Sequence, residues 1–258
     1  MKILIGLALI IIVIIVLSKR RRKEKAKANV PGSLPQLLQE HVAYYQKLSQ
    51  EDQQTFVAKA KDFLERTHIE GIGIEVEDID KTLIAASAVI PIFGFKEWKY
   101  YNLTNVIIYP DTFDETYQYE GDRRNILGMV GSGHMNGQMI LSRRALRDGF
   151  SASADKQNTA IHEFVHLLDK SDGAVDGIPQ NLLEHSYTLP WIQLVHKEIA
   201  RIEHGKSDIN PYAAMNTGEF LAVASEYFFE KPSELAQKHP QLYEILSKVF
   251  NQDLAKEP

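Results

Sequence analysis

The residues with the clearest chemical potential form the pentad His162-Glu163-Phe164-Val165-His166. On a helix, residues four apart lie on the same face, so His162 and His166 can direct their imidazoles at one point. Two imidazoles at this spacing can bind Zn²⁺, at Zn–N distances of about 2.0–2.1 Å. Glu163 is then placed to take a proton from a zinc-activated water and to pass it to a leaving amine. The pattern predicts zinc-dependent hydrolysis of peptide bonds, with Glu163 as the general base.

The simplest alternative is a packed helix whose two histidines have ordinary hydrogen-bond partners, because the pentad also arises by chance. The flanking residues 160–161 and 167–168 are apolar, so we expect the helix to be buried around its polar side. Buried His and Glu side chains need partners, and a metal ion supplies one. The chain has no cysteine, which leaves His, Asp and Glu as the available ligands.

A catalytic zinc site needs a third protein ligand, and the spacing leaves several acids open for that role. A predicted helix over 217–230 carries Glu219 and Glu226 two turns apart, on nearly the same face of an otherwise apolar segment. Asp172, six residues after His166, is the alternative, but Asp169 stands where a glycine would ease the return of the chain. Spacing alone weakly favours Glu219 over Glu226.

Several motifs that follow one another along the chain carry a resemblance to a known family. They lie at 162–169, 176–179, 211–214 and 219–229, with further matches at 109–111, 137–142, 240–243 and 251–253. Over about residues 34–255, the sequence resembles the Mlc titration factor A family of bacterial zinc peptidases. The catalytic domain of that family is similar to that of anthrax lethal factor.

The resemblance implies a role for four further residues. It implies that Glu219 is the third zinc ligand and that Tyr212 directs its hydroxyl at the site, where a phenol could stabilise an oxyanion. Glu226 would then orient a ligand histidine, and Asp169 is a similar candidate. For Tyr212 the alternative is a turn residue that packs its ring, and for Asp169 it is a surface acid at a helix end. The resemblance also implies aminopeptidase-like activity on peptides.

The elements that must position these residues indicate an α+β fold, a mostly helical zincin-like metallopeptidase domain with a small sheet. Apolar periodicity predicts helices over 82–92, 157–169, 188–203, 217–230 and 241–250, and one that starts at a capping box at Ser49 and ends near Thr67. Strands are expected over 71–76 and 105–109, and a hairpin or meander over 115–142. Met139, Ile140 and Leu141, in its last strand, are predicted to pair with an extended substrate at the sheet edge.

The first residues predict a membrane anchor. Residues 3–17 are all apolar, and a helix over 1–18 would span roughly 27 Å. The basic cluster at 19–27 follows this run, which argues against a cleaved signal peptide and places the following domain in the cytoplasm. We therefore expect an anchor in the lipid bilayer over 1–18, a basic juxtamembrane linker over 19–35 and a peptidase domain over 36–258. The predicted location is the bacterial cytoplasmic membrane, crossed once.

The charge distribution excludes one class of partner. Outside residues 1–27 the chain holds 33 acidic and 21 basic residues, a net charge of −12, which does not suit a nucleic-acid binder. The leading hypothesis is a membrane-anchored zinc peptidase that acts on a peptide or protein substrate. The alternative is a protein-binding regulator that sequesters a transcription factor or another partner at the membrane. A structural zinc protein is the third possibility.

Overall fold

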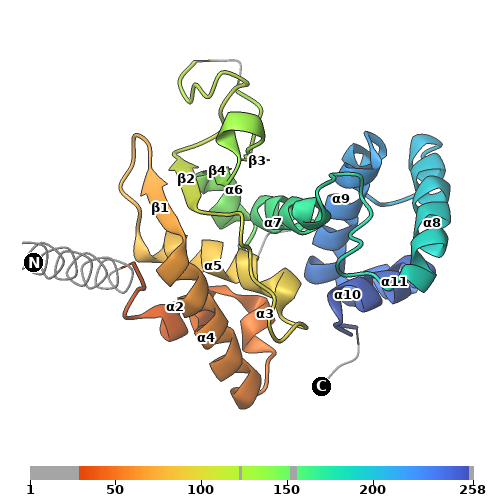
Figure 1. The fold of residues 1–258 in the computed structure, drawn as a ribbon, viewed down its shortest axis with the longest axis horizontal. Helices are drawn as coiled ribbons and strands as arrows, with labels where there is room; N and C mark the ends of the chain where they lie inside the picture. The colour runs from red at the N-terminus through yellow and green to blue at the C-terminus, as the bar shows by residue number, and fades with distance from the viewer. Residues whose placement is uncertain (1–28, 122–123, 152–155, 256–258) are drawn as a thin grey trace, which may run out of the picture.

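Helices pack beneath and beside a small four-stranded sheet in the computed structural model, which describes residues 29–121, 124–151 and 156–255 (Figure 1). The α-helices are α2 (Leu34–His41), α3 (Ala43–Gln46), α4 (Gln50–Arg66), α5 (Asp78–Ile92), α6 (Arg143–Asp148), α7 (Thr159–Asp169), α8 (His185–Glu203), α9 (Thr217–Glu230), α10 (Pro232–Lys238) and α11 (Pro240–Phe250). The strands are β1 (His68–Gly71), β2 (Asn105–Tyr109), β3 (Gly128–Val130) and β4 (Gln138–Ser142). Short 3₁₀ turns are η1 (Gly133–Met135), η2 (Lys170–Asp172) and η3 (Pro211–Ala214). The predicted α+β class is confirmed.

The sheet has the strand order β1-β2-β4-β3. β1, β2 and β4 run parallel, whereas β3 is antiparallel to β4. β4 is therefore an inner strand with hydrogen-bonded neighbours on both sides, and Met139, Ile140 and Leu141 are all buried. This corrects the prediction that these three residues pair with a substrate, because their main-chain groups are already used. The edge strand next to β4 is β3.

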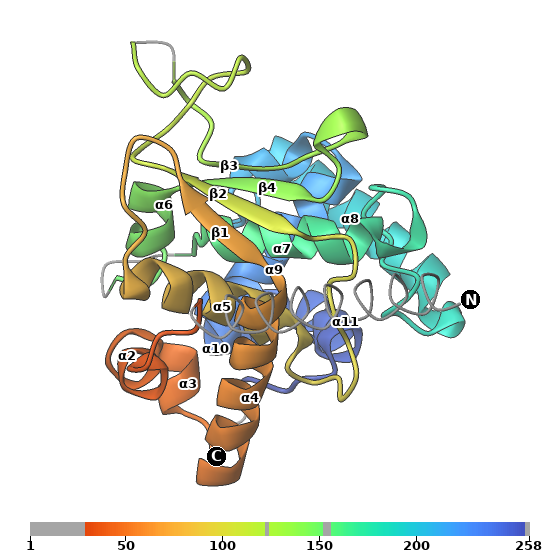
Figure 2. The ribbon, with the colours of Figure 1, turned by 60° about the vertical axis from the view of Figure 1, so that its left-hand side comes forward.

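The two faces of the sheet are covered differently. α5 and α7 pack beneath one face, as Figure 2 shows. On β4, Met139 and Leu141 point into this main core, while Ile140 points to the opposite face, as the period of two in a strand requires. That opposite face carries a smaller cluster built around Tyr109, Ile140 and Phe113. The pentad His162–His166 thus lies on a helix packed directly under the sheet.

Capping residues explain where several helices begin. The Ser49 hydroxyl accepts a hydrogen bond from the backbone N–H of Asp52, so the predicted start of α4 is confirmed. α5 begins at Asp78, four residues earlier than predicted, because Glu77 and Asp80 form a capping box there. The strand predicted over 71–76 is wrong. β1 ends at Gly71, and the chain turns at Gly73 with a φ of 72°, in the left-handed region that favours glycine.

The two helices that carry the candidate metal ligands begin at asparagines. The side chain of Asn158 accepts from the backbone N–H of Ile161 at the start of α7, and Asn216 does the same for Glu219 at the start of α9. α9 was predicted over the same residues, 217–230. α7 packs against α9. The residue at which each helix begins therefore also decides which of its side chains face the other helix.

The predicted location in the membrane needs correction. Within the described ranges, no helix is both long and apolar enough to cross a bilayer. The predicted anchor over 1–18 and the first part of the basic linker lie outside those ranges. The structure therefore provides no membrane location for this chain.

A buried acid joins the start of α5 to α6, the helix that directly follows β4. Asp80 is fully buried; its Oδ1 accepts a hydrogen bond from Arg147 Nε at 2.9 Å, and its Oδ2 forms an ion pair with Arg143 Nη2 at 2.8 Å. Arg143 is 17% exposed and Arg147 37%. Two guanidinium groups thus converge on one buried carboxylate, which holds α6 and the end of β4 against α5.

Removing this carboxylate leaves two partly buried guanidinium groups with Glu77, which is 55% exposed, as their remaining acidic partner among the described residues. We expect Asp80→Ala to lower the free energy of unfolding by about 3 kcal/mol, measured by urea denaturation of the full chain. Asp78→Ala is the matched control, because Asp78 lies on the same helix, is 58% exposed and has its carboxylate 3.9 Å from Lys81 Nζ. Equal losses for the two variants would contradict this account of α5 and α6.

Candidate metal centre

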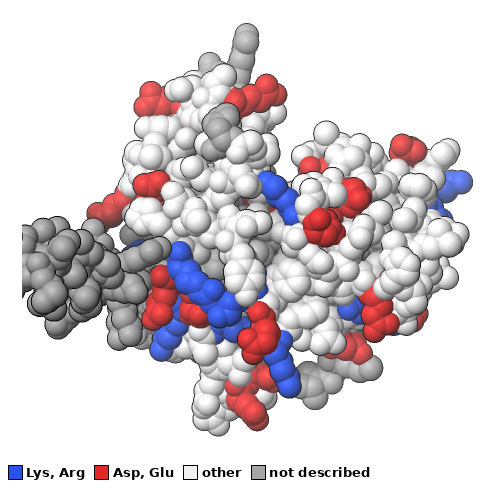
Figure 3. All heavy atoms as spheres, in the orientation of Figure 1, with Lys and Arg blue, Asp and Glu red and all other residues white. Residues whose placement is uncertain are grey.

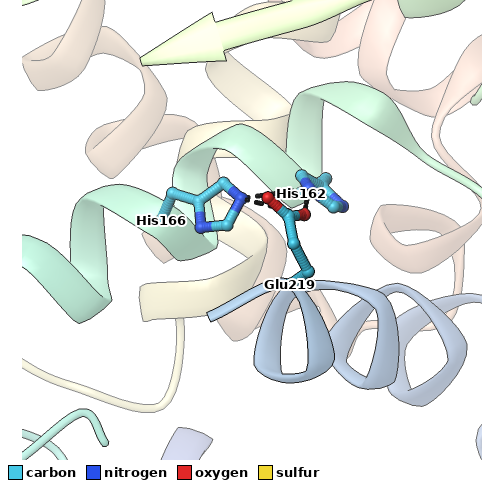
Figure 4. A group of neighbouring side chains, drawn as sticks. All are labelled: His162, His166 and Glu219. Carbon is cyan, nitrogen blue, oxygen red and sulfur yellow. Dashed lines mark hydrogen bonds and ion pairs between the residues drawn. The ribbon is translucent and has the colours of Figure 1, made fainter. Parts of the chain in front are cut away.

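Three donor atoms from α7 and α9 converge on one point. His162 Nε2 lies 3.0 Å from His166 Nε2 and 3.0 Å from Glu219 Oε2, and His166 Nε2 lies 3.5 Å from Glu219 Oε2. Figure 4 shows the two imidazoles on one face of α7 and Glu219 reaching them from α9. The three side chains are 12–18% exposed, so the cluster is shielded but open on one side. In Figure 3 the surface is hollowed between the part with the sheet and the part with α8 and α9.

This donor set fits a zinc ion. Ligands about 2.0–2.1 Å from a tetrahedral zinc lie about 3.3 Å from one another, and the three observed separations bracket that value. Two imidazole nitrogens and one carboxylate oxygen are also ligand types that zinc accepts. Two imidazole nitrogens that face each other at this distance gain little without a cation or proton between them. His162, His166 and Glu219 are therefore the residues that would hold the metal.

The charges around His162 favour a cation at this point. Burial lowers the pKa of His162, but hydrogen bonds with Glu219 and Glu226 outweigh it and raise the pKa to about 10. For Glu219, burial raises the pKa, and the two histidines outweigh this and lower it to about 2. Both shifts mean that the site stabilises positive charge next to an ionised carboxylate. A metal cation would be stabilised at this point by the same carboxylates that stabilise the proton on His162.

Glu226 holds His162 from the side away from the other donors. Its Oε1 lies 2.7 Å from His162 Nδ1, and its Oε2 accepts from the backbone N–H of Asn158 at 2.6 Å. A carboxylate at Nδ1 favours the tautomer that carries its proton there, which leaves the lone pair of Nε2 for a metal. The structure thus places Glu226 behind His162 and outside the group of metal-donor atoms.

Asp172, the alternative third ligand, is not part of the group of donor atoms formed by His162, His166 and Glu219. Its oxygens accept from the backbone N–H groups of Ala174 and Gln180, which holds the loop after η2.

Glu163 lies under the edge strand β3. Its side chain is buried, with 6% exposure for the residue, and this burial raises the pKa of the carboxyl, against the opposing effect of His162 and His166. No hydrogen-bond partner for this carboxylate is found within the described part of the chain. An acid that is buried, has no hydrogen-bond partner among the described residues and adjoins a candidate metal ligand has the features of a general base.

Tyr212 lies on η3, beside the same histidine. Its ring centroid is 6.1 Å from that of His162, and the residue is 47% exposed. Burial, and then the charges of Glu219 and Glu163, raise the pKa of the phenol, so the hydroxyl keeps its proton at neutral pH. Its turn is held by Asn210, whose side chain accepts from the Tyr212 N–H. Tyr212 is thus a protonated, half-exposed phenol beside His162.

Asp169 is fully buried at the end of α7, and not the surface acid of the alternative interpretation. Burial raises its pKa to about 6, and the N–H of Gly177 donates to its Oδ2. Its Oδ1 and the Nδ1 of His166 are both buried, and no hydrogen-bond partner for either is found within the described residues. The two atoms belong to residues that lie three positions apart on α7.

Asn158 was missed by the sequence analysis. It is fully buried, caps α7, and joins Glu226 to the first turn of α7 through its own N–H. Its side-chain amide also donates to Gly149 O and to Glu230 Oε1. A capping residue directly before an apolar helix was the available signal, but the link to Glu226 spans 68 residues and has no local signature.

Comparison with known proteins decides the family. The model of the glucose-regulated metallo-peptidase M90 family matches residues 17–251. The chain belongs to this family. The match covers all residues of the metal centre.

Curated relatives agree with this assignment and confirm the resemblance to Mlc titration factor A. Mlc titration factor A of Escherichia fergusonii is 30% identical over 224 residues, which cover 80% of this chain and 81% of that protein. The protein of the same name from Pectobacterium atrosepticum is 28% identical over 223 residues, with 80% and 81% covered. An uncharacterized protein of Synechocystis is 29% identical over 225 residues, with 83% and 82% covered.

The geometry of Glu226 predicts that it strengthens metal binding without touching the metal. Glu226→Gln keeps the shape of the side chain but replaces a charged acceptor at His162 Nδ1. We expect zinc affinity of the full chain to fall by about 10–100-fold, measured by competition with a chelator. Glu244→Gln is the control and should bind zinc as the wild type does, because the Glu244 carboxylate is exposed and pairs with Lys248 on α11. Unchanged affinity in Glu226→Gln would refute the role of this contact.

Proposed function

We propose that this chain is a zinc-dependent peptidase. The observation that carries the proposal is the convergence of three metal-donor atoms, all within 4.8 Å of one another, beside the buried and unengaged Glu163. A bound zinc ion would polarise the scissile carbonyl and lower the pKa of a water molecule. Membership of a metallopeptidase family supports the same conclusion.

The protein's own groups then have distinct tasks. The Glu163 carboxylate takes a proton from the attacking water and delivers it to the nitrogen of the leaving amine. The Tyr212 hydroxyl donates a hydrogen bond to the oxyanion that develops on the carbonyl oxygen. Glu226 orients His162 from behind through its contact with Nδ1. Burial of Glu163 keeps competing water from its carboxylate and so strengthens these interactions.

The substrate is an extended peptide that pairs with the edge strand β3. In the described part of the sheet, β3 has β4 as its partner on one side only, and its three residues are partly exposed. Main-chain groups at such an edge can bind a peptide as an additional strand. We further propose aminopeptidase-like activity, for which the support is the resemblance to the Mlc titration factor A family.

A second function has its own support. The relatives are named for the titration of Mlc, so binding and titrating a protein partner is the rival proposal. Such binding would not need a general base, whereas hydrolysis would. The two functions are therefore separated by variants of Glu163.

Glu163→Gln should separate metal binding from catalysis. The full-length variant is expected to retain its zinc, measured by elemental analysis, because Glu163 is not among the converging donors. Hydrolysis of a peptide library, followed by mass spectrometry, should fall by about 10²–10⁴-fold, the usual contribution of a general base. Retained hydrolysis would reject the mechanism. A wild-type protein that binds zinc and a partner but cleaves no peptide would support the titration function instead.

Tyr212→Phe should act on the rate and not on the metal. The variant keeps the ring beside His162 and removes only the hydroxyl. We expect kcat to fall by about 10²-fold with zinc content unchanged, as for the loss of one oxyanion donor. Tyr243→Phe is the control, because that hydroxyl hydrogen-bonds Asp253 near the C-terminus. An unchanged kcat in Tyr212→Phe would leave the tyrosine with a packing role only.

A further inference from the structure

The edge strand β3 passes so close to α7 that a side chain at Gly128 has no room. A Cβ atom built on Gly128 would lie 2.8 Å from both Cγ and Oε1 of Glu163, and 2.9 Å from Cγ2 of Thr159. Carbon atoms in contact normally stay about 3.5–4.0 Å apart. The space that a side chain would occupy at position 128 is therefore filled by the Glu163 side chain.

The backbone conformation does not explain this glycine. Gly128 is absent from the glycines with positive φ, and it lies in a strand, paired in register with Leu141. An alanine could adopt the same conformation without strain. What position 128 requires is the absence of a Cβ, which allows the close approach of β3 to α7.

Of the candidate functional side chains on α7, the close approach of Gly128 involves Glu163 and not His162 or His166. Thr159 and Glu163 are four residues apart, so both lie on the face of α7 under β3. His162 and His166 occupy the neighbouring face and point to α9. Glu163 has no hydrogen bond within the described residues to hold its carboxylate, and its Cγ and Oε1 fill the space beside β3 that a side chain at position 128 would occupy.

We propose that Gly128 is a positioning residue that places the Glu163 carboxylate beside the metal-donor atoms. The same strand then sets both the position of the general base and, through its open edge, the position of the peptide. The catalytic consequence rests on the proposed peptidase function, whereas the packing contact between Gly128 and Glu163 does not depend on it.

The catalytic part of the test compares two glycine variants of the full chain. In Gly128→Ala, kcat for peptide hydrolysis should fall by about tenfold or more, because a displaced reactive group loses its alignment. KM and zinc content should stay within about twofold, since the new methyl points at α7 and away from the strand edge and the histidines. Gly32→Ala is the matched control, because Gly32 has no atom within 4 Å of a built Cβ. Adding Thr159→Ser to Gly128→Ala removes Cγ2 and should restore part of kcat.

The second part measures the contact without any activity. Gly128→Ala should lower the melting temperature of the zinc-free protein by roughly 2–4 °C in the wild-type background. In a Glu163→Ala background the same substitution should change it by less, because the two nearest crowded atoms, Cγ and Oε1 of Glu163, are gone and only Thr159 Cγ2 remains. This double-mutant cycle reports the coupling between positions 128 and 163 directly. If Gly128→Ala alone does not fold but the double variant does, the coupling is also established.

The outcomes separate the two proposals. Coupling in the cycle, together with a low kcat in Gly128→Ala, supports the positioning role. Additive melting temperatures, or a wild-type kcat in Gly128→Ala, would overturn it. A wild-type protein without hydrolysis would reject the peptidase function and with it the catalytic consequence, while the cycle would still decide whether Gly128 places Glu163.

Discussion

Two imidazole nitrogens and a carboxylate oxygen face one another at 3.0–3.5 Å across the junction of α7 and α9. Such an arrangement is stable only if positive charge lies among the donor atoms. The neighbouring carboxylates stabilise such a charge. The pKa of His162 is raised, that of Glu219 is lowered, and Glu226 lies behind His162. The packing of α7 against α9 is thus the constraint on which the proposed chemistry depends.

Around that junction, each element supports the site through a different contact. Asn158 begins α7 and also holds Glu226 of α9, so one buried residue ties the start of one helix to the middle of the other. Asp169 ends α7 and accepts from Gly177 in the following loop. The sheet covers the remaining side, where β3 lies over Glu163. A general base that is held by packing can exchange its proton without losing a structural hydrogen bond.

Local sequence patterns predicted many of the helices and strands. They failed where contacts between distant segments determine the structure. α9 and β2 lie where periodicity and β-propensity placed them, because their apolar faces are encoded in consecutive residues. The strand expected over 71–76 failed because Gly73 turns the chain there. Met139–Leu141 were expected at an edge, yet strand order depends on pairing between segments far apart in the sequence, which alternation within one strand cannot reveal.

By itself, the sequence determined the spacing that puts His162 and His166 on one helix face, the ligand types available, and the membership of a metallopeptidase family. The choice of Glu219 as the third donor came from resemblance, since its spacing did not exclude Glu226. The tertiary structure decided that Glu219 converges with the histidines while Glu226 lies behind one of them, and that β3 is the open edge. These outcomes depend on how α9 is placed against α7 and on strand order, because side chains 53 or more residues apart meet only through packing.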